Sequence, residues 1–397
     1  FVNPIILGDA GMDKGAVFMA TALAAGLTTL LMGVYANYPF ALASGMGLNA
    51  YFAYTMVGGG LTWQQALGAV FISGIIGILV TLSGFREQLI KAIPMSLKHA
   101  MGAGIGMFIT FIGLTNAGIV VASEATYVDL GKFTEPGPLL ATIGLIITAI
   151  LVARGVKGGI LLGILITTVI GIPMGITQLP SSLISAPPSL APTMLKLDIA
   201  GVLKFSMFPV IFSLFFTDMF DSIGTFVGVA SKTGMIDEHG NLKRGNRALV
   251  ADSCGTIIGA LLGTSNTTTY VESAAGVNAG GRPGLTAVVV AICFLLATFL
   301  SPVVLAVPSV ATAPALILVG VLMCSVLKEI DWTDVFTAIP AFLTVIMMPL
   351  TSSIATGLAF GFVAYVLLAL LAGKAKEVHW FMYVLGVLFI FYFYVQA

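Results

Sequence analysis

The stretches YPFALASGMGLNAYF (residues 38–52) and TSNTTTYVESAAGVNA (residues 264–279) each interrupt an otherwise apolar part of the chain. The first carries a proline and two glycines early on, and the second is dense in β-branched residues. Both patterns predict a short extended piece followed by a half-helix. Extended backbone inside a bilayer is tolerated only where protein shields it or where it lines a cavity. We therefore expect the two pieces to pair with each other at the membrane midplane.

The composition is that of a membrane protein. Of 397 residues, 58% are hydrophobic and only 9% are charged, whereas a soluble domain carries about 25% charged residues. Apolar runs long enough to cross the hydrocarbon core, about 20 residues, lie at 138–153, 159–177, 284–307 and 352–373. These runs do not alternate as the strands of a membrane β-barrel do. The lipid bilayer is thus the expected partner, and the zero net charge points away from nucleic acid.

The distribution of Lys and Arg supports a count of about fourteen transmembrane segments. A last apolar segment, at 379–395, lies on the membrane or crosses it. Loops after even-numbered segments hold thirteen of the 17 Lys and Arg residues. This asymmetry predicts that those loops and the N-terminus are cytoplasmic. Because the sequence starts with Phe1 inside an apolar stretch, we expect that most of the first helix precedes it.

The two interrupted segments also reveal a repeat. GLNA at residues 47–50 aligns with GVNA at residues 276–279, an offset of 229. Seven segments per half is an odd number, so the halves must be inverted relative to each other, as in many secondary transporters. The expected fold class is an all-α polytopic membrane protein of two inverted seven-segment repeats, with short half-membrane strands in segments 3 and 10. In such proteins the substrate site lies between the repeats.

Four acidic residues fall within or beside membrane segments: Asp218, Asp221, Asp252 and Glu272. Ionised carboxylates at this depth are costly unless they face a cavity or a partner. Asp218 and Asp221 are three apart and so share one helix face. Two close carboxylates repel, which favours holding a proton and suits proton coupling. The alternative, neutralisation by a buried cation, has few candidates because no basic residue falls in the middle of a segment.

The other polar candidates each allow two interpretations. Glu272 either caps the second half-helix or accepts hydrogen bonds from ring N–H groups of a ligand. Asn49 either contacts a ligand or braces the crossing of the two segments. Asp252, near the start of the ninth segment, is expected to cap that helix or to pair with Arg247. Backbone groups freed by the breaks are expected to be satisfied by Asn3, Asn37 and Asn266.

Phe40, Phe220 and Tyr270 are candidates for stacking on a planar ligand, although with 26 Phe residues in the chain packing is the commoner role for each. No enzyme motif and no Walker sequence occurs. The three cysteines lack the spacing of a metal site. We therefore expect no enzyme activity, no metal and no cofactor, with a proton as the coupling ion.

Four motifs together resemble a known family: FVNP (residues 1–4), GMGLNAYF (45–52), FDSIGT (220–225) and YVESAAGV (270–277). The chain resembles the AzgA-like purine permeases of the nucleobase–cation symporter and nucleobase–ascorbate transporter group, in the right order over nearly its whole length. Two departures are Ser44 in place of a usual Pro and Pro283 in place of a usual Thr.

The resemblance implies proton-coupled uptake of adenine, guanine or hypoxanthine by alternating access in a bacterial inner membrane, and it allows a homodimer. It implies substrate binding by Asp218, Glu272, Asn49 and the amides around Ala43 and Val271, with Asp221 and Asp218 coupling the proton. It also implies a division into core domain (1–84 and 205–308), gate domain (85–177 and 309–373), linker (178–204) and C-terminal apolar segment (374–397).

Other solutes stay open as alternatives. The same architecture serves transporters of pyrimidine bases, xanthine or urate, and anion transporters and channels. The carboxylates argue against an anion because they would repel it. A purely structural or receptor role fits less well, since buried carboxylates and broken helices are costly without a ligand.

Overall fold

The structure, a computed structural model, describes residues 1–84, 92–180, 182–204, 207–230, 244–270, 272–278 and 280–396. It is mostly helical, and each of the fourteen expected segments has a counterpart among the described elements. Seven of the described helices are long and apolar enough to cross a membrane by length and composition, and four more apolar helices are shorter. The predicted fold class, a multi-span helical membrane protein, is confirmed.

In the first half the interrupted segment is β1–α3–η2, and the others are continuous helices. The elements are α1 (Val2–Asp9), α2 (Lys14–Leu31), the π-helix η1 (Met32–Ala36), β1 (Leu42–Ser44), α3 (Met46–Ala50), the π-helix η2 (Tyr51–Val57), α4 (Trp63–Leu82), α6 (Met95–Asn116), β2 (Val120–Ser123), β3 (Tyr127–Leu130), α7 (Pro136–Ala153) and α8 (Gly159–Gly171). Side-chain caps set several starts: the Asp13 carboxylate accepts from the Ala16 N–H at α2, and Thr62 with Gln65 forms a capping box at α4.

In the second half the interrupted segment is β4–α12. The elements are α9 (Ile199–Val202), α10 (Phe208–Ala230), α11 (Gly245–Leu262), β4 (Thr267–Thr269), α12 (Ser273–Asn278), α13 (Leu285–Ala297), the 3₁₀ turn η4 (Thr298–Leu300), α14 (Ser301–Leu305), α15 (Ser309–Cys324), η5 (Ser325–Glu329), α16 (Val335–Leu350), α17 (Ile354–Leu371), η6 (Ala375–Glu377) and α18 (Trp380–Gln396).

The two short strands pair with each other, as the sequence predicts. β1 and β4 are antiparallel, with Leu42 opposite Thr269 and Ser44 opposite Thr267. The ladder extends at one end, where the Gly45 N–H donates to the Asn266 carbonyl at 3.2 Å. Residues 264–269 are all fully buried or nearly so. Protein therefore shields this extended backbone, as its place inside an apolar environment requires.

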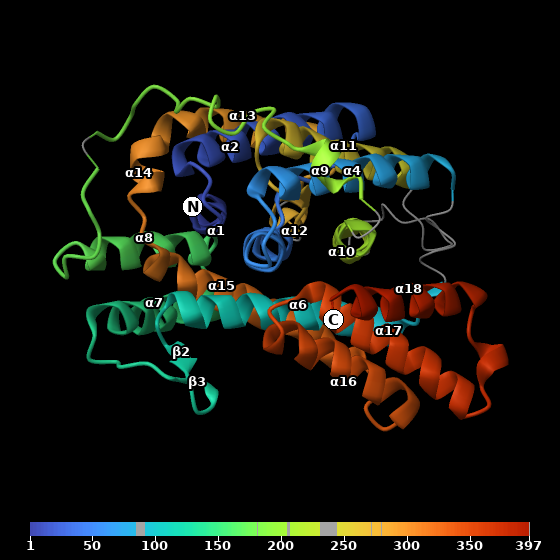
Figure 1. The fold of residues 1–397 in the computed structure, drawn as a ribbon. Coiled ribbons are helices and arrows are strands. Elements are labelled where there is room, and N and C mark those ends of the chain that lie inside the picture. Colours follow the sequence, from blue (N-terminus) through green and yellow to red (C-terminus); the bar gives the residue numbers. More distant parts are fainter. Residues whose placement is uncertain are drawn as a thin grey trace.

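The helices form two outer layers with broken segments between them (Figure 1). Helices α2, α4, α11 and α13 form one layer, and α6, α7, α15, α16 and α17 form the other. Helices α1, α3, α10 and α12 lie between the two layers. Both halves of the chain contribute to each layer, because α11 packs on α2 and α4, and α15 packs on α6 and α7. The halves are thus interleaved, as inverted-repeat folds require.

Small residues let helices of the second layer approach closely. A Cβ on Gly320 of α15 would lie 2.4 Å from the Gly106 carbonyl of α6. A Cβ on Gly357 of α17 would lie 2.9 Å from the Thr344 carbonyl of α16. Both distances are too short for a real side chain. The glycine spacing around residues 102–106 therefore serves helix packing at Gly106, as expected for membrane helices.

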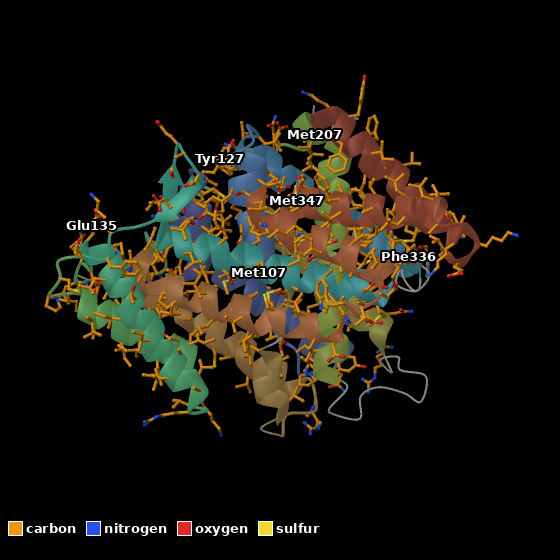
Figure 2. The ribbon with its side chains drawn as sticks, turned by 90° about the horizontal axis from the view of Figure 1, so that it is seen from below. Met107, Tyr127, Glu135, Met207, Phe336 and Met347 are labelled. Atoms are coloured by element: carbon orange, nitrogen blue, oxygen red, sulfur yellow. The ribbon has the colours of Figure 1, made fainter. Side chains whose placement is uncertain are left out.

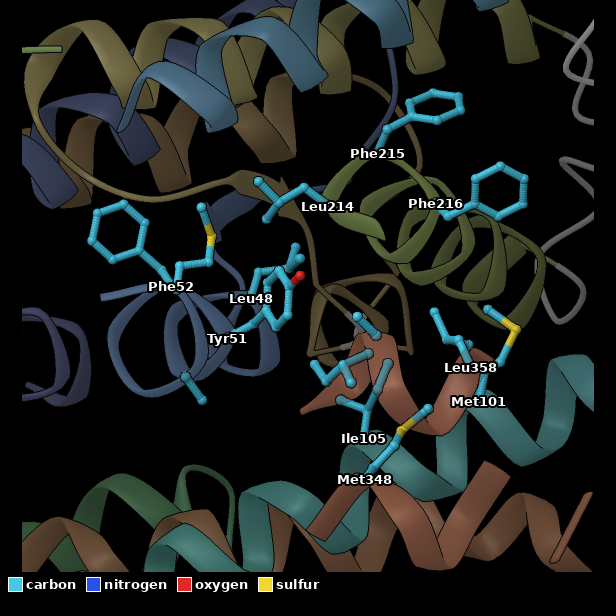
Figure 3. Close-up of a cluster of buried hydrophobic side chains, with 14 of the residues drawn as sticks. Leu48, Tyr51, Phe52, Met101, Ile105, Leu214, Phe215, Phe216, Met348 and Leu358 are labelled. Atoms are coloured by element: carbon cyan, nitrogen blue, oxygen red, sulfur yellow. The ribbon is translucent and has the colours of Figure 1, made fainter. Parts of the chain in front are cut away.

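A continuous apolar cluster joins the broken segments to the second layer (Figure 3). Leu48 of α3 and Leu214 of α10 belong to the same buried cluster as Ile105 of α6 and Met348 of α16. Gly47 lets α3 approach α6 closely, since a Cβ there would lie 2.7 Å from Cγ2 of Ile105. The cluster is built from apolar side chains.

The outer surfaces of the helices are apolar, as lipid contact requires. Met107 of α6 lies on the face seen from below (Figure 2) and is 38% exposed. Ile146 of α7, Val321 of α15 and Phe342 of α16 are all more than half exposed. The hairpin β2–β3 was not predicted: α6 ends at Asn116, and the chain then turns into two short strands.

The linker and the C-terminus pack against the helices. In the linker, the Asp198 N–H donates to the Gln64 carbonyl at 2.9 Å and the Leu195 N–H to the Leu261 carbonyl at 2.8 Å. The last apolar segment is helix α18, whose Phe389 ring packs on Phe212 of α10 and Phe362 of α17.

Candidate functional site

The strand crossing is held on both outer edges by side chains from neighbouring helices. On β1, the Thr29 hydroxyl of α2 accepts from the Leu42 N–H at 2.8 Å and lies 3.1 Å from the Leu42 carbonyl, to which it can donate. On β4, the Thr269 N–H donates to the Asp252 carboxylate at 2.9 Å. The backbone groups that face away from the ladder are thus paired at these positions.

Asp252 does not have the role that the sequence predicted. It lies in the third turn of α11, too far from the helix start to cap it, and is 2% exposed. Its carboxylate accepts hydrogen bonds from the hydroxyls of Ser222 and Thr269 and from the Thr269 N–H. Arg247, the expected partner, lies over the Tyr35 ring instead. Asp252 therefore connects α10, α11 and β4 at the crossing.

Asp218 and Asp221 lie on α10, facing the crossing. Asp218 is 8% exposed, and its Oδ2 accepts from the Thr256 hydroxyl at 2.8 Å. Asp221 is partly buried, and its Oδ2 would be 3.8 Å from a Cβ placed on Gly45, just before α3. The two aspartates interact with each other electrostatically, and each also interacts with Asp252. The predicted carboxylate pair is thus in fact a group of three.

Glu272 precedes α12 and is exposed rather than buried. It interacts electrostatically with Asp221 and with Tyr270. The structure therefore brings Glu272 near the α10 aspartates, because it lies close enough to Asp221 to interact with it. Tyr270 is partly buried, and its N–H extends the ladder to the Ala41 carbonyl at 3.3 Å. Val271 lies outside the described residues.

Asn49 and Ala43 are on the α3 side of the crossing. Asn49 is fully buried, and its Oδ1 accepts from the Ser265 hydroxyl, which ties α3 to the start of the β4 segment. Ala43 lies opposite Thr268 in the ladder. Asn49 thus braces the crossing in this structure, one of its two predicted roles, while contact of either residue with a ligand stays a prediction.

Phe40 is fully buried, with its ring stacked on Tyr38 at 5.2 Å between centroids and tilted against Phe226 at 5.3 Å. It packs in a small apolar cluster beside the crossing. In this conformation aromatic rings occupy its surroundings, so stacking of Phe40 on a ligand stays a prediction.

Several buried polar atoms around the crossing lack a hydrogen-bond partner. They are Asn3 Oδ1, Asn49 Nδ2, Asp218 Oδ1, Thr267 Oγ1 and both amide atoms of Asn266. Such groups normally find partners, so a cluster of them suits a site that binds polar molecules. Within the described ranges, no group of three or more His, Cys, Asp or Glu side chains is arranged to hold a metal ion.

Sequence reasoning missed two of these features. Asp252 was assigned to a helix end, although its position midway between Gly245 and Leu262 placed it at membrane depth. Asn266 was expected to satisfy backbone groups with its side chain, but its amide atoms make no hydrogen bond. Asn37 was expected to serve the backbone in the same way, and it does: its Oδ1 accepts from the Gly284 N–H at 2.8 Å. Asn3, also expected to serve the backbone, donates instead to the hydroxyls of Thr21 and Thr264.

Solved structures with this arrangement are known. The transmembrane domain of the cyanobacterial bicarbonate transporter BicA superposes with a TM-score of 0.66 at 15% identity, covering 89% of this chain and 93% of that one. This likeness shows the fold. The protein is a polytopic membrane protein of the seven-plus-seven inverted-repeat class.

Sequence comparison gives the family. Residues 1–382 match the model of the Permease family, Xan_ur_permease. The guanine/hypoxanthine permease PbuG of Bacillus subtilis is 50% identical, over 99% of this chain and 92% of that protein. The adenine permease AdeP of Escherichia coli is 43% identical, over 98% and 88%. The chain belongs to this family, in its AzgA-like branch, and is a membrane permease rather than an enzyme.

Proposed function

We propose that the protein takes up purine nucleobases together with protons by alternating access. The observation that carries this proposal is the convergence of Asp218, Asp221 and Glu272 on one buried crossing of two broken membrane segments. The names of the relatives, guanine/hypoxanthine and adenine permeases, supply the class of substrate. The cell membrane is the proposed location, with the N-terminus in the cytoplasm, as the distribution of Lys and Arg indicates.

The groups at the crossing suit a purine. A purine presents ring N–H donors and ring nitrogen acceptors in one plane. Glu272, exposed beside Asp221, would accept from a ring N–H, and such charge-assisted hydrogen bonds are the stronger kind. Asp218, Asn49 and the backbone around Ala43 and Val271 would complete the contacts, and Tyr270 would cover the ring face.

The same carboxylates suit proton coupling. Asp218, Asp221 and Asp252 interact within one buried group, so their negative charges repel when all are ionised. Binding of a proton relieves part of this repulsion. In the proposed cycle, the Asp218 and Asp221 pair accepts the proton as the purine binds. The proton and the purine are then released on the cytoplasmic side.

The movement would take place at the apolar cluster between the broken segments and the second layer. We assign the layer of α2, α4, α11 and α13, with the broken segments, to the core domain and the layer of α6, α7 and α15–α17 to the gate domain. One hydrogen bond connects the two parts at the edge of their interface: the Thr55 hydroxyl of η2 donates to the Ser352 carbonyl, between α16 and α17. This contact must break when the site opens to that side.

Uptake by proteoliposomes tests the proposal. Radiolabelled adenine, guanine and hypoxanthine are presented with and without an inward proton gradient, with protein-free liposomes as the control. We expect accumulation of at least one base that requires the gradient and collapses with a protonophore. Absence of uptake of every purine would contradict the substrate, and accumulation indifferent to the gradient would contradict the coupling.

A further inference from the structure

Asn266, directly before β4, is a fully buried residue with an unused side chain. It is 0% exposed, and neither Nδ2 nor Oδ1 has a hydrogen-bond partner. Its backbone is in use, because its carbonyl accepts from the Gly45 N–H at 3.2 Å. A buried carboxamide without partners costs about 1–3 kcal/mol per unsatisfied group. A polar residue kept here at such a cost indicates a partner that changes during the working cycle.

Asp218 supplies that partner. Its carboxyl lies against the Asn266 side chain, close enough to interact. Oδ2 of Asp218 is occupied by the Thr256 hydroxyl, whereas Oδ1 has no partner. The Asp218 carboxyl, with one oxygen unpartnered, and the Asn266 carboxamide therefore lie close together, one on α10 and the other at the start of β4.

The chemistry of the two groups makes their hydrogen bond depend on a proton. An ionised carboxylate can only accept, and it requires the Nδ2–H of Asn266 as donor. A protonated carboxyl donates, and it requires Oδ1 of Asn266 as acceptor. A carboxamide can serve either state by rotating about its last torsion angle. Leucine has the same branching and the same number of heavy side-chain atoms but can serve neither state.

The charges around this pair come from three elements. Asp221 lies on the same helix as Asp218, and Asp252 faces both from α11. Glu272, before α12, interacts with Asp221. All of these groups are acidic. The neutral groups in contact with Asp218 are the Thr256 hydroxyl of α11 and the carboxamide of Asn266, and of these two Asn266 belongs to the β4 segment.

We propose that Asn266 is a positioning residue that exchanges donor for acceptor when Asp218 gains a proton, and so transmits the protonation of α10 to the strand crossing. The route is short, because the same residue holds Gly45, at the start of α3, through its carbonyl. This inference rests on the proposed function and adds to it the residue that links the proton to the purine site.

Two assays of one variant separate coupling from binding. For Asn266→Leu in proteoliposomes, we measure purine counterflow at equal pH on both sides, which needs no proton gradient. We also measure gradient-driven accumulation over a range of external pH. We expect counterflow within about threefold of wild type, accumulation reduced about tenfold or more, and a flattened pH profile, because loss of one hydrogen bond is worth about a factor of ten.

Asn266→Thr, whose hydroxyl can donate and accept, should recover part of the pH dependence. Ser73→Ala is the control, because it removes a buried hydroxyl away from the site. The Ser73 hydroxyl donates a hydrogen bond to the Val70 carbonyl within α4. Thermal unfolding in detergent shows whether each variant is folded, and if Asn266→Leu is not, Asn266→Thr carries the comparison.

Two results would overturn the inference. One is a wild-type pH profile and accumulation in folded Asn266→Leu. The other is a loss of counterflow equal to the loss of accumulation, which would make Asn266 a substrate or structural residue. Neither resembles failure of the proposed function, in which wild-type protein itself shows no purine uptake or no response to the gradient.

Discussion

The two strands at the crossing meet the same physical requirement with different chemistry. The outer edge of β1 is braced by Thr29, a neutral hydroxyl that serves both the N–H and the carbonyl of Leu42. The outer edge of β4 is braced by Asp252, a carboxylate that serves the N–H and the hydroxyl of Thr269. In both cases the brace comes from the long helix that precedes the strand in sequence.

The difference shows that the repeat is conserved in geometry but not in charge. The acidic residues at the crossing all come from the second half of the chain: they are Asp218, Asp221, Asp252 and Glu272. The first half contributes hydroxyls and amides, such as Thr29, to the same place. Backbone satisfaction inside a bilayer needs hydrogen-bonding groups but not charge. The charges of the second half therefore call for a function beyond bracing, and substitutions can test the two roles separately.

The largest effect is expected from Asp252→Ala. It would leave both Thr269 donors buried without their acceptor, while the Ser222 hydroxyl would keep its hydrogen bond to the Thr268 hydroxyl. Each such group costs about 1–3 kcal/mol, so the free energy of unfolding should fall by several kcal/mol and transport should be lost. Thermal unfolding in detergent and purine uptake measure the two effects. The control is Asp13→Ala, which removes only a helix cap of α2, typically about 1 kcal/mol. A loss for Asp252→Ala no larger than that of the control would show that β4 does not need its brace.

Glu272→Gln should separate ligand binding from bracing. Because Glu272 is exposed, its loss of charge should leave thermal unfolding unchanged. Loss of a charge-assisted hydrogen bond to a ring N–H is worth about 1.5–3 kcal/mol, so the purine concentration for half-maximal uptake should rise about 10- to 100-fold. Glu124→Gln, at an exposed position in the β2–β3 turn, should change neither. Wild-type affinity in Glu272→Gln would remove Glu272 from the proposed binding site.

The neutral brace should matter less than the charged one. Thr29→Val removes the hydroxyl that serves Leu42 and should cost about 1–2 kcal/mol. The next residue gives a matched control: Thr28 is also fully buried, but its hydroxyl bonds within its own helix to the Ala24 carbonyl. Thermal unfolding should separate Thr29→Val from Thr28→Val. Equal stability of the two variants would mean that β1 is held by other contacts.

The sequence predicted the fold better than the details of the site. Pro39, the glycines and the threonine run of 267–269 disfavour helix, and the two stretches occupy equivalent places in a repeat, so their pairing was predictable. The same reasoning predicted that Asp218 and Asp221 share a face of one helix. These are local rules of periodicity and backbone preference, and tertiary contacts do not override them here.

What the sequence did not predict depends on which segments cross in space. Asp252 is a brace only because β4 passes alongside α11, and the Asn266 side chain does not serve the backbone because it lies against Asp218. An acidic residue seven positions into a helix carries no local signal that distinguishes a buried brace from a residue near a helix end. The β2–β3 hairpin was missed because its alternating apolar residues continue the apolar pattern of α6.

Ser44→Ala should have the smallest effect, and the reason sharpens the comparison between the two strands. Ser44, in β1, belongs to a hydrogen-bond network around Asn3. Three hydroxyl oxygens lie within hydrogen-bond distance of the Asn3 Nδ2: Thr21 at 2.6 Å, Thr264 at 2.8 Å and Ser44 at 3.2 Å. An amide nitrogen has only two hydrogens, so Thr21 and Thr264 can satisfy it when the Ser44 hydroxyl is absent. We expect a stability change below about 0.5 kcal/mol and uptake within about twofold of wild type. Thermal unfolding and uptake of the variant beside wild type check both values. A tenfold loss of uptake without loss of stability would instead place the Ser44 hydroxyl in contact with the ligand, and the β1 side of the crossing would then bind substrate rather than only support the strand.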